Sequence, residues 1–281
     1  MNSELNSFFL ETLSSIKQAI YTCHNSLEHI SGSNFSLAEF QHYKAVQLGL
    51  FQMNRICSSA EYLLTHNSYN SHRTYSSYNI DELLEQISSS FCSTVSEYFP
   101  VSVKHYTRLD HSFFVQTDER KLELAILQIL YCCLKNSSIE SFDPINITFY
   151  ATETKNSIVF HIRDNSLPLN PVITDAINSN DSSVLFISDE ISFNAIMAQS
   201  VAVAKKAVDE LSGKLVYAPL KSGNRFDIYL PKFQSHGQLG MASPAPYIPN
   251  LALYAATFAE FKLAFTLDKI CKANNEAEVL E

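Results

Sequence analysis

The residues of this sequence that could bind or transform a ligand are few, and most stand apart from one another. Lys135 and Asn136 end a helix-like segment and could contact phosphate, although dipole and capping effects alone favour both residues at a helix end. Asp164 ends a strand-like segment, where an aspartate often caps its own turn. No paired carboxylates and no Ser/His/Asp arrangement stand out. These residues therefore identify no reaction by themselves.

The cysteines show neither CxxC spacing nor a Cys/His pattern typical of a metal site. They are Cys23, Cys57, Cys92, Cys132, Cys133 and Cys271. A chain of 281 residues can build a core without disulfides. We therefore predict that the cysteines are reduced, buried, small apolar residues of a cytoplasmic protein, and that the chain holds no metal.

Glycine content and charge exclude several classes of ligand. No glycine lies between Gly49 and Gly213, which argues against a phosphate-binding glycine loop in the middle of the chain. The net charge is −9 and no basic stripe appears, so we predict no nucleic-acid partner. The acidic start has no signal-peptide pattern, and no apolar run reaches about 18 residues, so no membrane association is predicted.

Two segments position Lys135, Asn136 and Asp164. Residues 118–135 have apolar side chains at i, i+3, i+4 and i+7, which predicts an amphipathic helix with Asp118 as its N-cap. Residues 156–166 alternate as a half-buried strand does, and they follow another strand over 145–152. Further helices are predicted over 80–99, 195–211 and 251–272, strands over 101–107, 113–117, 214–218 and 225–230, and a loop over 170–194.

The first 66 residues carry two series of apolar positions spaced alternately by three and four residues. One series runs from Leu5 to Ile30 and the other from Tyr43 to Leu64. They predict two antiparallel helices joined by residues 31–34. Because one helical hairpin cannot bury both apolar seams, we predict that two chains form a four-helix bundle.

Residues 118–138, 158–169 and 193–231 together resemble the ATP-binding domain of sensor histidine kinases, which have the GHKL-type fold of the gyrase and Hsp90 ATPases. QILYCCLK is similar to the family's NLLxNAxK, and GNRFDIYLP is similar to its GTxFxIxLP. The N-terminal hairpin resembles the family's dimerisation and phosphotransfer module, since FQMNRICSSAEYLL is similar to QNxxRLLxLVNNLL. The resemblance places Asp164 at the adenine, and Cys132, Lys135 and Asn136 beside the phosphates and Mg²⁺.

Most of the residues that bind ATP in that family are replaced here. Cys132 takes the place of the Mg²⁺-associated asparagine, and a thiol is a poor ligand for this hard cation. Ser166 and Pro168 replace both glycines of the family's DxGxG turn, and Pro168 has a fixed φ and no N–H. Counting back from the GGKI-like segment 212–215, the family's phosphate loop GxGxG falls on Ile196, Ala198 and Ser200. Their side chains stand where glycine would admit phosphate.

The phosphoacceptor position of the first helix is also altered. In the family pattern HExxxPLxxI, core residues follow the histidine at +2, +6 and +9. Ser14 in the histidine position puts apolar seam residues at all three offsets, whereas His24 puts one there. We therefore predict that Ser14 replaces the phosphoacceptor. His24 is the alternative, because it lies beside a core position and HNSL is similar to the HDxxN of short phosphotransferases.

The predicted fold class is α+β, with a helical hairpin (a dimeric four-helix bundle), a GHKL-type α/β sandwich whose mixed sheet is covered by helices on one face, and a C-terminal helix. The predicted boundaries are 1–66 for the hairpin, 67–79 for a linker, 80–235 for the ATPase-like domain, and 236–281 for a second linker and helix.

The function that the resemblance implies is that of a degenerate, cytoplasmic histidine-kinase-like protein. We expect a homodimer without ATP or Mg²⁺ that does not phosphorylate itself and acts through a response regulator or another histidine kinase. Two alternatives stay open. In one, a phosphotransferase relays phosphate through His24 without ATP. In the other, an active ATP-dependent protein-histidine kinase has divergent ATP-binding motifs.

Overall fold

The computed structural model describes residues 3–29, 35–65, 75–107, 114–137, 144–178, 193–232 and 245–280. The predicted turn at 31–34, the predicted loop beyond residue 178 and most of both predicted linkers lie outside these ranges. In chain order the elements are α1 (Ser3–Glu28), α2 (Leu37–Thr65), β1 (Ser76–Asn79), α3 (Ile80–Val95), β2 (Val101–Thr107), β3 (Phe114–Thr117), α4 (Glu119–Lys135), β4 (Ile145–Glu153), β5 (Ser157–Asp164), α5 (Pro171–Asn178), α6 (Phe193–Glu210), β6 (Lys214–Pro219), β7 (Asn224–Pro231) and α7 (Leu251–Leu280).

The chain divides into two units. The helical unit comprises Met1–Tyr69 and Phe258–Glu281, and the sheet unit comprises Asn70–Thr257. Helix α7 therefore begins in the sheet unit and ends in the helical unit.

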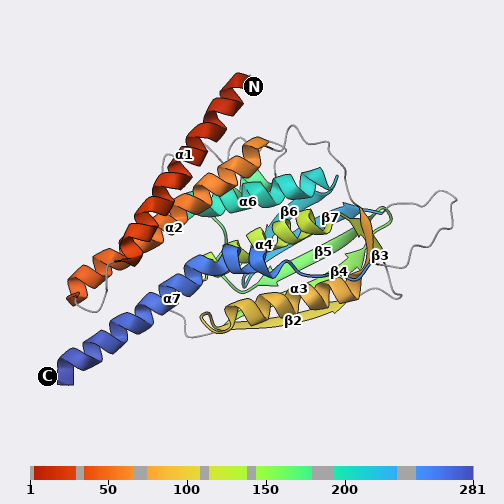
Figure 1. Cartoon of the computed structure of the whole chain (residues 1–281). Coiled ribbons are helices and arrows are strands. Elements are labelled where there is room, and N and C mark those ends of the chain that lie inside the picture. The colour runs from red at the N-terminus through yellow and green to blue at the C-terminus, as the bar shows by residue number, and fades with distance from the viewer. Residues whose placement is uncertain are drawn as a thin grey trace. The chain divides into compact units, whose positions relative to one another are not determined.

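In the helical unit, α1 and α2 lie side by side (Figure 1) and share a small apolar core. Ile20, Leu50 and Cys57 are buried in it, and Leu13 and Leu27 pack against them. Four other positions of the two predicted seams remain at least 42% exposed, namely Phe9, Ile16, Val46 and Met53. The hairpin therefore covers only part of the apolar surface that its sequence presents.

Not all the cysteines are buried as predicted. Cys57, Cys132 and Cys133 are buried, but Cys92 and Cys271 are half-buried and Cys23 is exposed. Cys23 belongs to the predicted seam of α1, so its exposure has the same origin as that of the neighbouring seam residues.

Helix α7 packs against α2 within the helical unit. The Gln52 amide donates to Glu260 Oε1 over 2.9 Å, and Lys44 pairs with Asp268. Phe258 and Leu267 of the same helix are 0% and 5% exposed, so apolar burial accompanies these polar contacts. The helix predicted over 251–272 thus exists, and it extends to Leu280.

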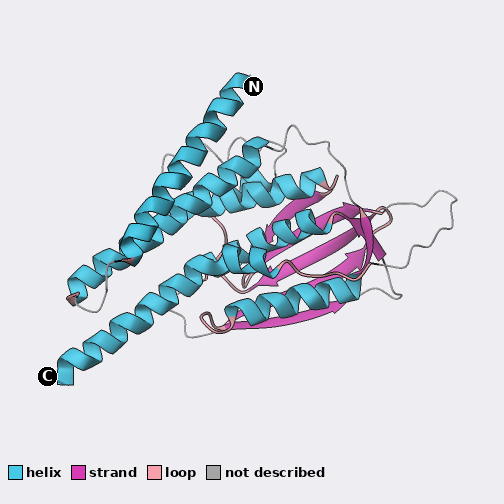
Figure 2. Ribbon diagram, in the orientation of Figure 1, coloured by secondary structure: helices cyan, strands magenta, loops and turns pink. Residues whose placement is uncertain are grey.

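The sheet unit is built on a five-stranded mixed sheet with the strand order β2-β4-β5-β7-β6. Strands β2 and β4 are parallel, and the other neighbouring pairs are antiparallel. Helices α3, α4 and α6 cover one face of the sheet (Figures 1 and 2). On that face Phe149, Phe160 and Phe226 are each 1% exposed, and the apolar side chains of α4 are buried as well. The predicted helix-covered mixed sheet is confirmed.

Two short elements were not anticipated from the sequence. Ser76–Asn79, within the stretch taken as a linker, forms β1 and pairs with β3 in antiparallel register. Pro171–Asn178, predicted as loop, forms α5, with Ile173 and Ile177 buried at 3% and 1% exposure. Proline is favourable at the first position of a helix, and one turn of spacing between two isoleucines is enough to bury this short helix.

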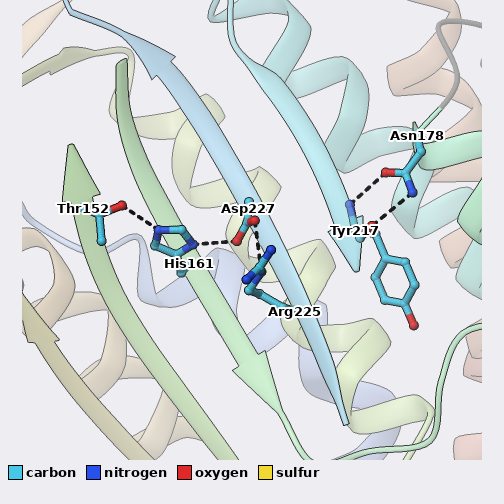
Figure 3. A network of polar contacts seen from close by, with 6 residues as sticks. All are labelled: Thr152, His161, Asn178, Tyr217, Arg225 and Asp227. Carbon is cyan, nitrogen blue, oxygen red and sulfur yellow. Dashed lines mark hydrogen bonds and ion pairs between the residues drawn. The ribbon is translucent and has the colours of Figure 1, made fainter. Parts of the chain in front are cut away.

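Helix α5 also protects an edge of the sheet. The Asn178 amide donates to the carbonyl of Tyr217, and the Tyr217 N–H donates to Asn178 Oδ1, both over 3.0 Å (Figure 3). The side-chain amide thus pairs with the backbone of edge strand β6 as another strand would. Such cover prevents edge strands from pairing with other chains.

Residues 245–254 hold the start of α7 against α4. The Tyr247 hydroxyl donates to Glu123 Oε1 over 2.6 Å, and the Asn250 N–H donates to the same oxygen over 2.9 Å. Glu123 is 3% exposed, and its burial raises the pKa of this carboxyl, although the two hydrogen bonds oppose the shift.

Candidate functional site

The predicted nucleotide site lies where the end of β5 meets the start of β7. Asp164 is 5% exposed, and its Oδ1 accepts hydrogen bonds from the Ser166 N–H over 2.6 Å and from the Ser166 hydroxyl over 2.5 Å. The aspartate therefore caps its own turn, a common role for Asp two residues before an amide donor. Its other oxygen, Oδ2, is buried and has no hydrogen-bond donor among the described residues.

Asn224 holds the same turn in place through hydrogen bonds. It occupies the position of the threonine in GTxFxIxLP and is 1% exposed. Its amide nitrogen lies 2.9 Å from Asp164 Oδ1 and 2.9 Å from the Leu167 carbonyl oxygen. Its Oδ1 accepts from the Tyr217 hydroxyl over 2.6 Å, and that hydroxyl accepts from the Leu169 N–H over 2.9 Å. An amide NH₂ thus approaches Asp164 as the amino group of adenine would.

Asn136 joins this network, and Lys135 lies next to it in the chain. The Asn136 side chain donates to the Leu167 carbonyl, and the Leu167 N–H donates to the Asn136 carbonyl over 3.4 Å. Lys135 is half-buried in the last turn of α4. Of the predicted site residues, Asn136 and Asp164 therefore lie at the same turn. Asn136 hydrogen-bonds to the backbone of that turn at Leu167.

Cys132 lies inside the core. It is 0% exposed, and its thiol donates to the Met197 carbonyl of α6 over 3.7 Å. The adjacent Cys133 is 2% exposed, and burial together with the nearby Asp164 carboxylate raises the pKa of its thiol. A protonated thiol is no metal ligand, so neither cysteine suits Mg²⁺.

The segment on which the family's phosphate loop would fall is a helix in this structure, in agreement with the helix predicted over 195–211. Ile196, Ala198 and Ser200 all belong to α6 and are 7%, 5% and 0% exposed. Beyond the first turn, the backbone amides of an α-helix donate to carbonyls four residues earlier and are not available to phosphate. Ala198 and Ser200 lie beyond that turn. The residues present therefore do not fit a Mg²⁺–nucleotide complex of the family's kind.

Ser14 and His24 lie on α1 in the helical unit. Ser14 is exposed, whereas His24 is half-buried and lines a cavity of about 90 Å³. The polar residues around this cavity include Lys17, His24 and Asn54. Its remaining lining residues are Ile20, Tyr21, Leu50 and Phe51. Lys17 also pairs with Glu61 over 2.8 Å. Positions 17, 20, 21 and 24 share one face of a helix, so the spacing alone could have grouped them.

A second polar arrangement, which the sequence did not reveal, lies on the other face of the sheet (Figure 3). Thr152 Oγ1 is 2.7 Å from His161 Nε2, and His161 Nδ1 is 2.6 Å from Asp227 Oδ1. Arg225 Nε pairs with Asp227 Oδ2 over 3.1 Å. His161 does not project into solvent, because it bonds β4 and β7 to β5. We interpret the group as a tether between three strands.

No helix in the described ranges is long and apolar enough to span a bilayer. Nor do three or more His, Cys, Asp or Glu side chains there gather closely enough to hold a metal ion.

Solved histidine kinase structures resemble this chain in fold. The Acinetobacter baumannii histidine kinase AdeS aligns with a TM-score of 0.50 and 12% identity, over 80% of this chain and 98% of AdeS. Histidine kinase ThkA, in complex with the response regulator protein TrrA, aligns with a TM-score of 0.53 and 12% identity, over 82% of this chain and 62% of that chain. Full-length ShkA in complex with AMPPNP also aligns with a TM-score of 0.53 and 12% identity, over 84% of this chain and 47% of ShkA.

By sequence, no family model and no curated protein matches the chain. The fold evidence rests on the arrangement of the helical hairpin, the mixed sheet and the helices on one of its faces. The chain has the fold of the sensor histidine kinases.

Proposed function

We propose that this chain is a pseudokinase of two-component signalling, which binds no ATP and acts by contact with another protein. The partner is a response regulator or another histidine kinase. This partner class is suggested by the fold, because one protein of similar fold is a histidine kinase in complex with a response regulator.

The observation that carries the proposal is the hydrogen bond from Asn224 to Asp164. A nucleobase amino group at Oδ1 would have to displace an internal donor that lies 2.9 Å away, and Oδ2, which accepts no hydrogen bond from the described residues, is itself buried. Displacement would also release the Leu167 carbonyl and the Tyr217 hydroxyl, both of which bond to Asn224. The Leu167 carbonyl would keep its hydrogen bond from Asn136, but the Tyr217 hydroxyl would lose its acceptor, and a buried polar group left without a partner costs about 1–3 kcal/mol. Binding of adenine at Asp164 is therefore opposed by the protein's own network.

Thermal unfolding in the presence of ATP and Mg²⁺ tests the proposal. A ligand at about 100 times its dissociation constant stabilises a protein by about 2.7 kcal/mol, which shifts Tm by several degrees. We expect no shift at millimolar ATP. Mg²⁺ alone is the control for a general salt effect, and an active histidine kinase domain is the positive control. A reproducible rise with ATP and Mg²⁺ together, absent with Mg²⁺ alone, would contradict the proposal.

We further propose that the chain forms a homodimer through α1 and α2. Phe9, Ile16, Val46 and Met53 occupy seam positions but remain exposed in a single chain, at 43%, 42%, 50% and 46%. Regularly spaced apolar side chains of this kind are suited to a helix bundle between two copies. Sedimentation equilibrium, which measures molar mass, distinguishes a dimer from the 31.7 kDa monomer.

A second candidate function is phosphotransfer through His24 without ATP. It is favoured by the cavity that His24, Lys17 and Asn54 line together, where the Lys17 ammonium, now paired with Glu61 over 2.8 Å, would have to exchange that partner for a phosphoryl group. A cation and an amide donor are the groups that would stabilise a phosphoryl group beside an imidazole nitrogen. Both functions are compatible with a sheet unit that lacks a nucleotide site.

This candidate makes its own prediction. After incubation with a ³²P-phosphorylated receiver domain, the chain is expected to carry an acid-labile label that His24→Ala abolishes. His29→Ala is the matched control, because His29 is an exposed histidine just beyond α1 and should leave the label unchanged. A label that persists in His24→Ala would exclude His24 as the acceptor.

A further inference from the structure

The face of the sheet opposite the helices carries two adjacent rows of side chains. In strand register, the first row contains Tyr106, Tyr150, His161 and Asp227, one each from β2, β4, β5 and β7. The second row contains Lys104, Thr148, Arg163 and Arg225, from the same four strands. Residues two apart in a strand point to the same side, so both rows share one face.

The first row is a continuous stack that ends at a carboxylate. The rings of Tyr106 and Tyr150 lie 5.2 Å apart and nearly parallel, and those of Tyr150 and His161 lie 4.3 Å apart. His161 then bonds to Asp227 (Figure 3). Tyr150 is 3% exposed, whereas Tyr106, on the edge strand, is 37% exposed. This row holds the sheet together and leaves one ring open to solvent.

The second row is positively charged, and most of its charged side chains have no carboxylate partner among the described residues. On this face the five strands contribute Lys104, Arg163, Lys214 and Arg225 against a single carboxylate, Asp227. Arg225 pairs with Asp227 over 3.1 Å. Lys104, Arg163 and Lys214 have no carboxylate partner among the described residues. A chain of net charge −9 therefore presents a local excess of positive charge.

Arg163 is positioned to bind an anion. Its guanidinium lies over the Tyr150 ring, with 4.9 Å from Cζ to the ring centroid, so the side chain is held along the sheet. Its Nε is buried and makes no hydrogen bond within the described part of the chain. It stands directly opposite Arg225 across β5 and β7, and like charges in such cross-strand pairs repel. A carboxylate from outside would relieve this repulsion and satisfy the free donors.

We infer that this cationic row is the docking surface for an acidic segment of a partner protein. Charge complementarity supports an acidic occupant. Neighbouring strands lie about 4.8 Å apart, so the row offers cations at spacings of roughly 5 and 10 Å, which suit glutamates on successive turns of a helix. A single-stranded nucleic acid is less suited, because base stacking needs free ring faces and only Tyr106 is substantially exposed.

This inference deepens the proposed function by naming the chemistry of the partner, and its test does not involve ATP. A fluorescent peptide of about ten residues, rich in glutamate, is titrated with the full-length chain at low ionic strength, where surface charges are weakly screened. We expect saturable binding that weakens as salt is added. Arg163→Gln is expected to weaken binding by roughly two- to fivefold, since it removes one ion pair, and Lys104→Glu is expected to weaken binding further, since it also reverses a charge.

Lys155→Glu is the matched control, because Lys155 is an exposed lysine in the turn between β4 and β5. It makes the same charge change as Lys104→Glu and should alter the dissociation constant less than twofold. Arg225 is left intact, since it neutralises the buried Asp227. Equal Tm values for the variants and the wild type show that the sheet is folded.

Three results would overturn the inference. The first is no binding of the acidic peptide even at low salt. The second is equal weakening by Lys155→Glu and by the two row variants, which would mean that only net charge matters. The third is tighter, row-dependent binding of a single-stranded oligonucleotide of equal length, which would assign the surface to nucleic acid.

Discussion

Replacing Gly223 with alanine is expected to unfold a large fraction of the sheet unit. Gly223 has φ +99°, in the left-handed region that side chains rarely adopt. A Cβ built there would lie 1.8 Å from the Asp164 carbonyl oxygen and 2.7 Å from the Asn165 Cα. Both neighbours are backbone atoms, so the turn after β5 would have to move away from β7. We expect a loss of more than about 4 kcal/mol, against total domain stabilities of about 5–15 kcal/mol.

Urea denaturation followed by circular dichroism measures this loss. Gly49→Ala is the control, because Gly49 lies inside α2 and nothing comes within 4 Å of its added Cβ. Alanine is favoured over glycine in a helix interior by about 0.5–1 kcal/mol, so this variant should be slightly more stable than the wild type. A Gly223→Ala protein within about 1 kcal/mol of the wild type would show that the turn at Asp164 adapts, which contradicts its tight fastening.

Much of the fold could be predicted because local pattern and tertiary packing agree. The apolar period of residues 118–135 defined α4, and Asp118 caps it by accepting from the Arg120 and Lys121 amides over 3.2 and 3.4 Å. The missed elements lack such a signal. Strand β1 is only four residues long, with the polar sequence SSYN, and exists because β3 pairs with it. Helix α5 has two turns and several residues typical of loops.

Only part of the candidate site could be predicted from the sequence. Missing glycines and the thiol at Cys132 are visible as residue types, and the structure places Ile196, Ala198 and Ser200 in a helix. The hydrogen bond from Asn224 to Asp164 could not be predicted, because the two residues are 60 positions apart in the sequence. The cationic row was hidden for the same reason, since its members are scattered along the chain and only strand pairing aligns them.

Replacing Asn224 with alanine is expected to cost about 3 kcal/mol. The side chain is 1% exposed, donates to Asp164 Oδ1 and the Leu167 carbonyl, and accepts from the Tyr217 hydroxyl. Alanine removes three hydrogen bonds, each worth about 0.5–1.5 kcal/mol, and leaves the buried Tyr217 hydroxyl without an acceptor, whereas Asp164 Oδ1 keeps its bonds from Ser166 and the Leu167 carbonyl keeps its bond from Asn136. Networks of this kind also lose more than single bonds suggest. Asn156→Ala, at an exposed asparagine in the turn between β4 and β5, should stay within about 0.5 kcal/mol of the wild type.

The Asn224→Ala protein also separates two reasons for the proposed lack of ATP binding. If Asn224 alone blocked the adenine, the variant would gain a Tm increase with ATP and Mg²⁺, because Asp164 Oδ1 would have lost a donor. We expect no increase, since Ser166 still donates to Asp164 and the phosphate loop is still the helix α6. Removing one obstruction does not restore the backbone amides that phosphate needs. An ATP-dependent increase in this variant, but not in the wild type, would mean that Asn224 is the sole barrier and that α6 can accommodate phosphate.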